Sequence, residues 1–187
     1  MNLLFAMSRS LRLQPMREPP SSRVPAQASD PPRRKPLTLL PQQFELAVDA
    51  PDVKRALEHA ADSLSRAHGL DPAPVFRALW RREQIGSTAV GHGVALPHAR
   101  ISGIGEPLML FMRPKYAIDF DAPDGRLVTR IWVILVPADG SAEDHLNLLA
   151  AVAEACSDEG LRANLDSAAT ADEAARALRD WTQRQPA

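Results

Sequence analysis

The residues with the most evident chemistry lie in one short stretch, from Arg82 to His98. A neutral imidazole such as that of His98 is abundant near pH 7, and it acts as a nucleophile without a further base to remove a proton. The guanidinium of Arg82 offers paired donors that fit phosphate oxygens, and the hydroxyls of Ser87 and Thr88 add further donors. The stretch therefore predicts a nucleophilic histidine beside an anion-binding loop.

Two glycines, Gly91 and Gly93, lie between these donors and His98. Glycine lets the backbone turn so that its N–H groups face a ligand, as they do in anion-binding nests. Residues 94–96 are apolar and predict a short buried strand, and Pro97 fixes the direction of the chain after it. We therefore expect His98 at the end of that strand, with Gly91 and Gly93 contributing phosphate-binding N–H groups.

Hydrophobic periodicity and capping residues predict the elements that must position this stretch. Helices are expected over residues 51–67, from Pro72, after Ser141 and after Thr170. Strands are expected at residues 44–48, 108–112, 118–121 and 127–136, with a hairpin turn at residues 124–125. Strands in the middle of the chain with helices toward both ends predict an α/β layer architecture.

The beginning of the chain differs in composition from the rest. Residues 1–36 hold seven prolines and seven of the 22 basic residues, with only two acidic residues. Prolines at this density prevent regular secondary structure, so we expect a disordered leader over residues 1–36 and one folded domain over residues 37–187. An organellar transit segment and a start codon placed too early are the alternatives for the leader.

Charge and cysteine content narrow the class of protein. The formal net charge is -1, which gives no general attraction to nucleic acid or to an anionic membrane. No apolar run reaches the roughly 20 residues that span a bilayer, so membrane insertion is not expected. The single cysteine, Cys156, lies on an apolar helical pattern and predicts core packing. A reducing compartment, and hence a cytoplasmic location, is therefore expected.

Residues 82–98 read R-E-Q-I-G-S-T-A-V-G-H-G-V-A-L-P-H. This run resembles the signature of the phosphotransferase-system (PTS) enzyme IIA domains of the mannitol/fructose type. It is most similar to the nitrogen-regulatory branch, whose pattern is approximately R-E-x-x-G-S-T-G-I-G-x-G-V-A-I-P-H-G. The similarity continues through residues 118–125 and 144–150, and it covers residues 37–182. Several motifs at fixed spacing make the resemblance far more specific than a single glycine pattern.

The resemblance implies a fold, a site and a function. The fold is α/β, with a mixed β-sheet flanked by helices on both faces. In the family, the residues that correspond to His98, Arg82 and His145 are the phosphorylated histidine and its two active-site neighbours. The function is a phosphoryl carrier that accepts phosphate from an HPr-like phosphocarrier and acts in nitrogen- or potassium-linked regulation. A potassium transporter or a sensor kinase is then the candidate target, and no cofactor is expected.

Two other functions stay open at this point. One is a separate IIA subunit of a fructose- or mannitol-type sugar transport system, which would pass its phosphoryl group to a IIB protein. The other is a non-catalytic regulatory binding module. The presence of His98 argues against a loss of phosphorylation but not against such binding.

Two alanines depart from the family pattern. Ala89 and Ala99 stand where the family usually has glycine, and a positive φ at either position would cost about 1 kcal/mol or shift the loop. His92 occupies a variable position and is interpreted as a solvated loop residue. A metal site made by His92, His98 and His145 is not expected, because no carboxylate or cysteine stands at a supporting spacing.

Overall fold

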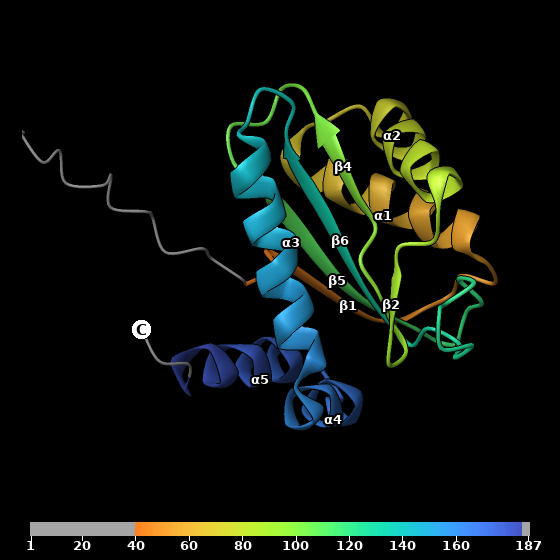
Figure 1. The fold of residues 1–187 in the computed structure, drawn as a ribbon, viewed down its shortest axis with the longest axis vertical. Helices are drawn as coiled ribbons and strands as arrows, with labels where there is room; N and C mark the ends of the chain where they lie inside the picture. Colours follow the sequence, from red (N-terminus) through yellow and green to blue (C-terminus); the bar gives the residue numbers. More distant parts are fainter. Residues whose placement is uncertain (1–39, 185–187) are drawn as a thin grey trace, which may run out of the picture. The chain divides into compact units, whose positions relative to one another are not determined.

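The computed structural model describes residues 40–184 of the 187-residue chain. The leader predicted over residues 1–36 lies outside the described residues, so its disorder and the domain boundary at residue 37 stay predictions. Within the described range, one strand is followed by two helices, then by five strands, and three helices close the chain (Figure 1). The strands are β1 (Gln43–Val48), β2 (Ala89–Gly91), β3 (Val94–Ala95), β4 (His98–Ile101), β5 (Leu108–Pro114) and β6 (Arg130–Pro137). The helices are α1 (Val53–His68), α2 (Pro72–Ile85), α3 (Ala142–Ser157), α4 (Glu159–Ser167) and α5 (Ala171–Arg184).

Local signals in the sequence set where the helices begin and end. The side chains of Asp52, Asp71 and Ser141 accept hydrogen bonds from the first backbone N–H groups of α1, α2 and α3. Gly69 ends α1 in the left-handed conformation, with φ of 68°. The predicted end of the first helix and the predicted start of the second are therefore confirmed. None of the helices in residues 40–184 is long and apolar enough to cross a membrane.

The sheet is mixed, with β6 near its middle. The strand order is β1-β5-β6-β3-β2, and β4 also pairs with β6. β5 runs antiparallel to β6, whereas β3 and β4 both run parallel to it. β3 and β4 share one edge of β6, because Val94 aligns with Arg130 and His98 aligns with Ile134. The short strand β3, which lies between β6 and β2, therefore leads through Leu96 and Pro97 to His98.

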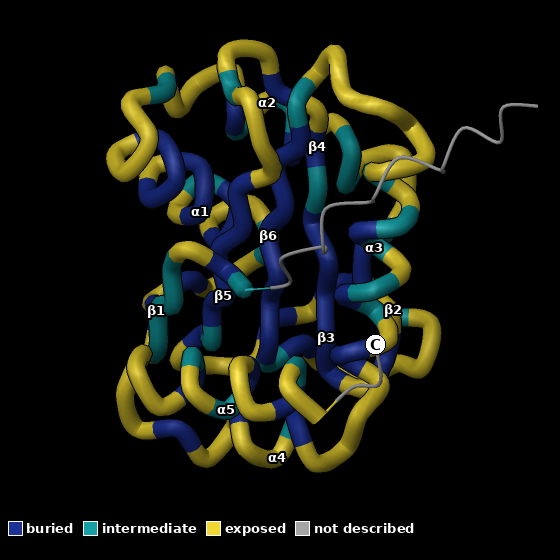
Figure 2. The backbone as a smooth tube through the Cα atoms, turned by 90° about the vertical axis from the view of Figure 1, so that its left-hand side faces the viewer, coloured by how far each residue is buried: buried dark blue, intermediate teal, exposed yellow. Residues whose placement is uncertain are grey.

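Helices cover both faces of this sheet, as the sequence predicted. Alternate residues of β6 pack in opposite directions, because successive side chains of a strand point to opposite faces. Val133 and Leu135 belong to the core formed with α1 and α2, while Trp132 and Ile134 belong to the core formed with α3, α4 and α5. Figure 1 shows α1 and α2 on one side of the strands and α3 on the other, and Figure 2 shows β6 buried along its length.

Two parts of the fold differ from the sequence-based expectation. Residues 118–121 form no strand of a hairpin, but only one bridge, between Ile118 and Val128. The reason is local: the Asp119 side chain accepts a hydrogen bond from the Asp121 N–H (2.9 Å), and this turn takes Asp121 to φ of 54°. The sequence analysis also missed α4, whose short apolar face consists mainly of Leu161 and Leu165.

Candidate active site

His98 is the first residue of β4 and not the last residue of the preceding strand. β3 ends at Ala95, and Pro97 has no N–H group to donate, but its carbonyl accepts a hydrogen bond from the Ile134 N–H (2.9 Å). The chain therefore stays along β6 and resumes pairing at His98. The chain does reach the histidine from a short strand through a proline, as expected, but His98 begins the next strand instead of ending the preceding one.

Two hydrogen bonds determine which ring nitrogen of His98 carries the proton. Nδ1 lies 2.8 Å from the carbonyl oxygen of Leu96, which can only accept, so Nδ1 is protonated. The Nε–H of Arg82 donates to Nε2 over 3.1 Å, and arginine can only donate, so Nε2 carries the lone pair. His98 is therefore held as a neutral imidazole whose nucleophilic atom is Nε2.

The surroundings of His98 favour the neutral form. Burial lowers its pKa below the ordinary value of 6.5, because charged groups are less well solvated inside the protein. The positive charge of Arg82 lowers the pKa further, while the bond to Leu96 and the carboxylate of Glu83 act in the opposite direction. The net effect is a lowered pKa, so His98 is uncharged and available as a nucleophile at neutral pH.

His145 lies against His98 although the two are far apart in the sequence. Its ring stands edge-on to that of His98, with ring centroids 5.4 Å apart and an interplanar angle of 71°. His145 is in the first turn of α3, where Ser141 caps the helix. Its Nε2 is buried and has no hydrogen-bond partner among the described residues. Burial, with smaller contributions from His98 and Arg100, lowers the pKa of His145.

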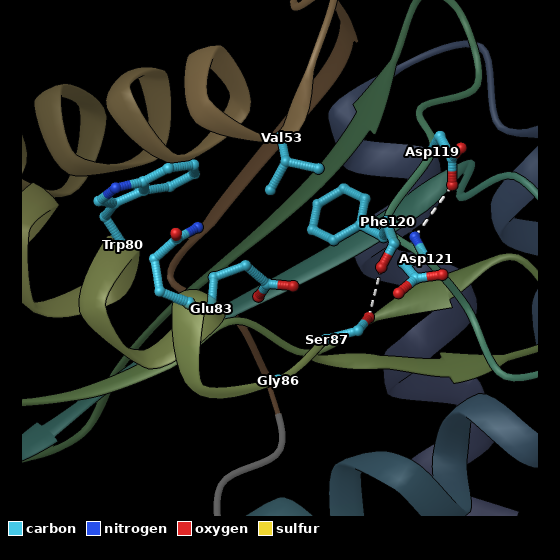
Figure 3. A pocket seen from close by; sticks show the side chains of 9 residues that line it. Val53, Trp80, Glu83, Gly86, Ser87, Asp119, Phe120 and Asp121 are labelled. Atoms are coloured by element: carbon cyan, nitrogen blue, oxygen red, sulfur yellow. Dashed lines mark hydrogen bonds between the residues drawn. The ribbon is translucent and has the colours of Figure 1, made fainter.

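The hydroxyls of Ser87 and Thr88 are already engaged. Ser87 donates its hydroxyl proton to the carbonyl oxygen of Phe120, as Figure 3 shows. Thr88 donates its hydroxyl proton to Oε2 of Glu83 over 2.5 Å, and its backbone N–H donates to Oε1 over 3.0 Å. To bind phosphate as the sequence suggests, either hydroxyl would have to turn away from its present acceptor.

The structure does not bring Gly91 and Gly93 to His98. Both have positive φ, 87° and 73°, but they form the tight turn between β2 and β3. Gly93 precedes His98 by five residues of nearly extended chain, which corresponds to about 16 Å. The N–H group of His92 donates to the carboxylate of Asp124 (2.8 Å), and that negative charge disfavours a phosphate at the turn. Gly93 and His98 are therefore close in the sequence but far apart in space, because the chain between them is extended.

The two alanines that depart from the family pattern introduce no backbone strain. Among the described residues, the non-glycine positions with positive φ are Ala47, His92 and Asp121. Ala89 and Ala99 therefore adopt ordinary backbone conformations, and both are buried. Within residues 40–184, no three His, Cys, Asp or Glu side chains are grouped so that they could hold a metal ion.

A cavity of about 590 Å³ lies beside Glu83 and Ser87 (Figure 3). The aromatic rings of Trp80 and Phe120 and the carboxylates of Asp119 and Asp121 contribute to its wall. Its acidic lining disfavours the binding of an anion such as phosphate in this cavity.

Two residues near the site were missed by the sequence analysis. Arg100 follows His98 by two residues in β4, so strand alternation places both on one face, and its charge contributes to the lowered pKa of His145. Arg100 is held by the carbonyl oxygens of Ala138 (3.3 Å) and Gly140 (2.9 Å). The second is Glu83, which follows Arg82 in the motif and for which the sequence alone predicts no role. Its contacts with Thr88 could have been inferred only from the fold.

The fold and the site together define a class: a mixed-sheet α/β domain with a neutral histidine held between an arginine and a second histidine. Residues 38–181 match the family described as "Phosphoenolpyruvate-dependent sugar phosphotransferase system, EIIA 2", and the chain belongs to this family. Proteins of this family are phosphotransfer components. The family assignment and the predicted fold are thereby confirmed.

Some relatives of this chain are described as nitrogen regulatory proteins and one as a sugar-specific EIIA component. The chain is 36% identical over 135 residues to a nitrogen regulatory protein of Pseudomonas aeruginosa, covering 72% of this chain and 87% of the relative. It is 35% identical over 130 residues to a PTS system fructose-specific EIIA component of Haloferax volcanii, covering 70% and 82%. The crystal structure of the nitrogen regulatory protein IIA-Ntr from Neisseria meningitidis is 36% identical, with a TM-score of 0.68 over 72% of this chain and 92% of that one.

Proposed function

We propose that this protein is a phosphoryl carrier of the nitrogen-regulatory type, which accepts a phosphoryl group on Nε2 of His98 from an HPr-like phosphocarrier. The observation that supports it most directly is the pair of hydrogen bonds that hold His98 neutral. The Leu96 carbonyl fixes the proton on Nδ1, and the lone pair on Nε2 faces the Arg82 guanidinium. A neutral nucleophile beside a fixed cation suits attack on an anionic phosphoryl group.

The transfer exchanges one nitrogen–phosphorus bond for another. Nε2 of His98 attacks the phosphorus in line while the bond to the donor's histidine breaks, and the electron pair of that bond returns to the donor ring. Arg82 then exchanges its contact with Nε2 for contacts with the phosphoryl oxygens, whose charge its planar fork matches. His145, with a buried nitrogen that has no partner among the described residues, contributes a further polar contact to these oxygens. No oxidant or reductant is consumed.

The cellular setting is a further part of the proposal. The nitrogen regulatory relatives support a role in nitrogen-linked regulation, and the resemblance suggests a potassium transporter or a sensor kinase as the target. A cytoplasmic location fits the single cysteine, because Cys156 is buried and burial raises the pKa of its thiol to about 12. Such a thiol is unreactive at neutral pH and forms no disulfide within the chain.

The test is phosphorylation in a reconstituted system. The full-length chain is incubated with phosphoenolpyruvate, enzyme I and the phosphocarrier, and the phosphorylated form is resolved by native gel and mass spectrometry. His98→Ala should remove the modification while the far-ultraviolet circular dichroism is unchanged. His68→Ala, at the exposed end of α1, is the matched control and should be modified as the parent is. Modification of the His98→Ala chain would refute the assignment.

A second function is favoured by one specific comparison. The fructose-specific EIIA component of Haloferax volcanii is as similar to this chain as the nitrogen regulatory relatives are. A sugar-transport IIA subunit would pass its phosphoryl group to a IIB protein. The test is transfer from the phosphorylated chain to a purified fructose-type IIB protein. If this transfer is about as fast as phosphorylation of the chain by the phosphocarrier, sugar transport is favoured over regulation.

A further inference from the structure

Glu83, near the end of α2, binds Thr88 in the segment that follows the helix. One of its carboxylate oxygens accepts the Thr88 N–H over 3.0 Å, and the other accepts the Thr88 hydroxyl over 2.5 Å. Thr88 is only 4% exposed, so these two donors have little access to water. Hydrogen bonds to a charged acceptor are stronger than those between neutral groups, and buried donors are costly to leave unpaired. Glu83 and Thr88 therefore form a clamp over residues 83–88.

The clamped segment contains the group that orients Arg82. The carbonyl oxygen of Gly86 accepts from Nη1 of Arg82 over 2.8 Å, and Nε of the same guanidinium donates to His98 over 3.1 Å. The guanidinium is planar, so fixing Nη1 at Gly86 also fixes the direction in which Nε points. The Glu83–Thr88 clamp thus holds the backbone around Gly86, Gly86 binds Arg82, and Arg82 binds Nε2 of His98.

We propose that Glu83 is a positioning residue for phosphoryl transfer, which acts by holding the Gly86 carbonyl and through it the Arg82 guanidinium in register with Nε2 of His98. The inference rests on the proposed function of His98. It also gives Thr88 a different part from direct phosphate binding, because the Thr88 hydroxyl proton is committed to Glu83. Figure 3 shows the Glu83 side chain next to Ser87, at the segment that the clamp holds.

The experiment measures initial phosphorylation rates, by the phosphocarrier, of full-length variants. Glu83→Gln places an amide NH₂ where one of the two acceptors stood, so the clamp loses at least one bond. Because a misplacement of about 1 Å can slow a reaction on the order of a hundredfold, we expect Glu83→Gln to be slower by about tenfold or more. The control is Glu154→Gln, the same exchange at an exposed position of α3, which should match the parent rate.

Double-mutant cycles separate positioning from other roles. If Glu83 acts through Arg82, Glu83→Gln should slow Arg82→Lys much less than it slows the parent chain. Thr88→Val should not slow the Glu83→Gln chain further, whereas a Thr88 that binds phosphate itself would give independent effects. Thr88→Ser, which keeps the hydroxyl, should be faster than Thr88→Val. Full additivity in both cycles would overturn the proposal.

A second readout does not depend on phosphorylation. The ¹⁵N resonance of Nε2 in the neutral ring of His98 reports the hydrogen bond from Arg82, and it should shift in Glu83→Gln in the direction seen for Arg82→Lys. An unshifted resonance together with a parental rate would refute the role of Glu83. If the parent chain accepts no phosphate but the resonance shifts as expected, the proposed function fails while the Glu83 clamp stands.

Discussion

Arg82 donates a hydrogen bond from its Nε to Nε2 of His98 over 3.1 Å. The acceptor is the lone pair of the nitrogen proposed as the nucleophile. The contact has two consequences. It keeps Nε2 unprotonated, because a proton there would face the arginine N–H. In the transfer proposed above, the arginine would have to leave Nε2 before the nitrogen attacks, and its donors would then be free for the phosphoryl oxygens. Under that proposal, one residue both holds the unreacted ring and binds the incoming group.

Arg82→Lys should slow phosphorylation with little effect on stability. A lysine has a single ammonium group and cannot contact Gly86 and His98 with the geometry of the planar fork. We expect a rate lower by roughly tenfold to a hundredfold, because the paired donors act chiefly on charge in the transition state. Rates and thermal melts of the same samples check this. Arg81→Lys, at the exposed neighbouring position, is the control, and equal rates for the two variants would contradict the role of Arg82.

The protonation of His98 makes stability depend on pH in one direction. Its pKa is lowered by burial in the folded state, so the unfolded chain binds the proton more readily. The stabilisation that the neutral ring gives the folded state is fully present above pH 6.5. It is lost as the pH falls below 6.5 and through the lower pKa of His98 in the folded state. The melting temperature of the parent chain should therefore decrease more between pH 7 and pH 5 than that of the His98→Ala variant. A ring-nitrogen titration by NMR should place the midpoint of His98 below 6.5, and a midpoint above 6.5 would contradict this prediction.

His145 should respond to phosphorylation of its neighbour. Burial lowers its pKa in the unphosphorylated chain, and a phosphoryl dianion on His98 should raise it, because an opposite charge stabilises the imidazolium. His145→Ala should still accept phosphate, on the order of a hundredfold more slowly, with a changed pH–rate profile. The check is an NMR titration of His145 before and after phosphorylation. If the two titrations coincide, the phosphoryl group does not reach His145.

The leader should be dispensable for phosphoryl transfer. The proposed site uses residues 82–145, and the proline content of residues 1–36 predicts no regular structure. A chain that begins at Pro36 should accept phosphate at the rate of the full-length chain. Hydrogen exchange of the full-length chain provides the second measurement, because strong amide protection within residues 1–36 would contradict the prediction of disorder.

Asp166→Asn should destabilise the fold without slowing transfer. The Arg130 side chain is buried, and its Nε and Nη2 donate to the two carboxylate oxygens of Asp166 while Nη1 donates to the His92 carbonyl. An amide at position 166 loses the charge and one acceptor, which corresponds to roughly 1–3 kcal/mol. Thermal melts should show a clear decrease relative to Asp180→Asn, an exposed control on α5. A reduced phosphorylation rate at a temperature where Asp166→Asn is folded would indicate coupling between α4 and the site.

Local sequence signals were sufficient for the end of α1, the start of α2 and the family. Gly69 and Asp71 act on backbone groups a few residues away, so their effect is already decided in the sequence. The motif around His98 was sufficient to identify the family, because its residues stand at fixed spacing in one contiguous segment. Cys156 was correctly predicted to be buried, since its helix is apolar on one face.

Only the tertiary structure decided which of these residues meet. Gly91 and Gly93 are near His98 in sequence but lie beyond an extended strand, whereas His145 is 47 residues away and stands edge-on to its ring. Whether Nε2 of His98 carries a lone pair depends on Arg82, which reaches it from another element. The lowered pKa values of His98 and His145 arise from burial, and burial is set by how α2 and α3 pack around the sheet. Distances and solvation are properties of the packed chain, so they follow from long-range contacts that no local pattern specifies.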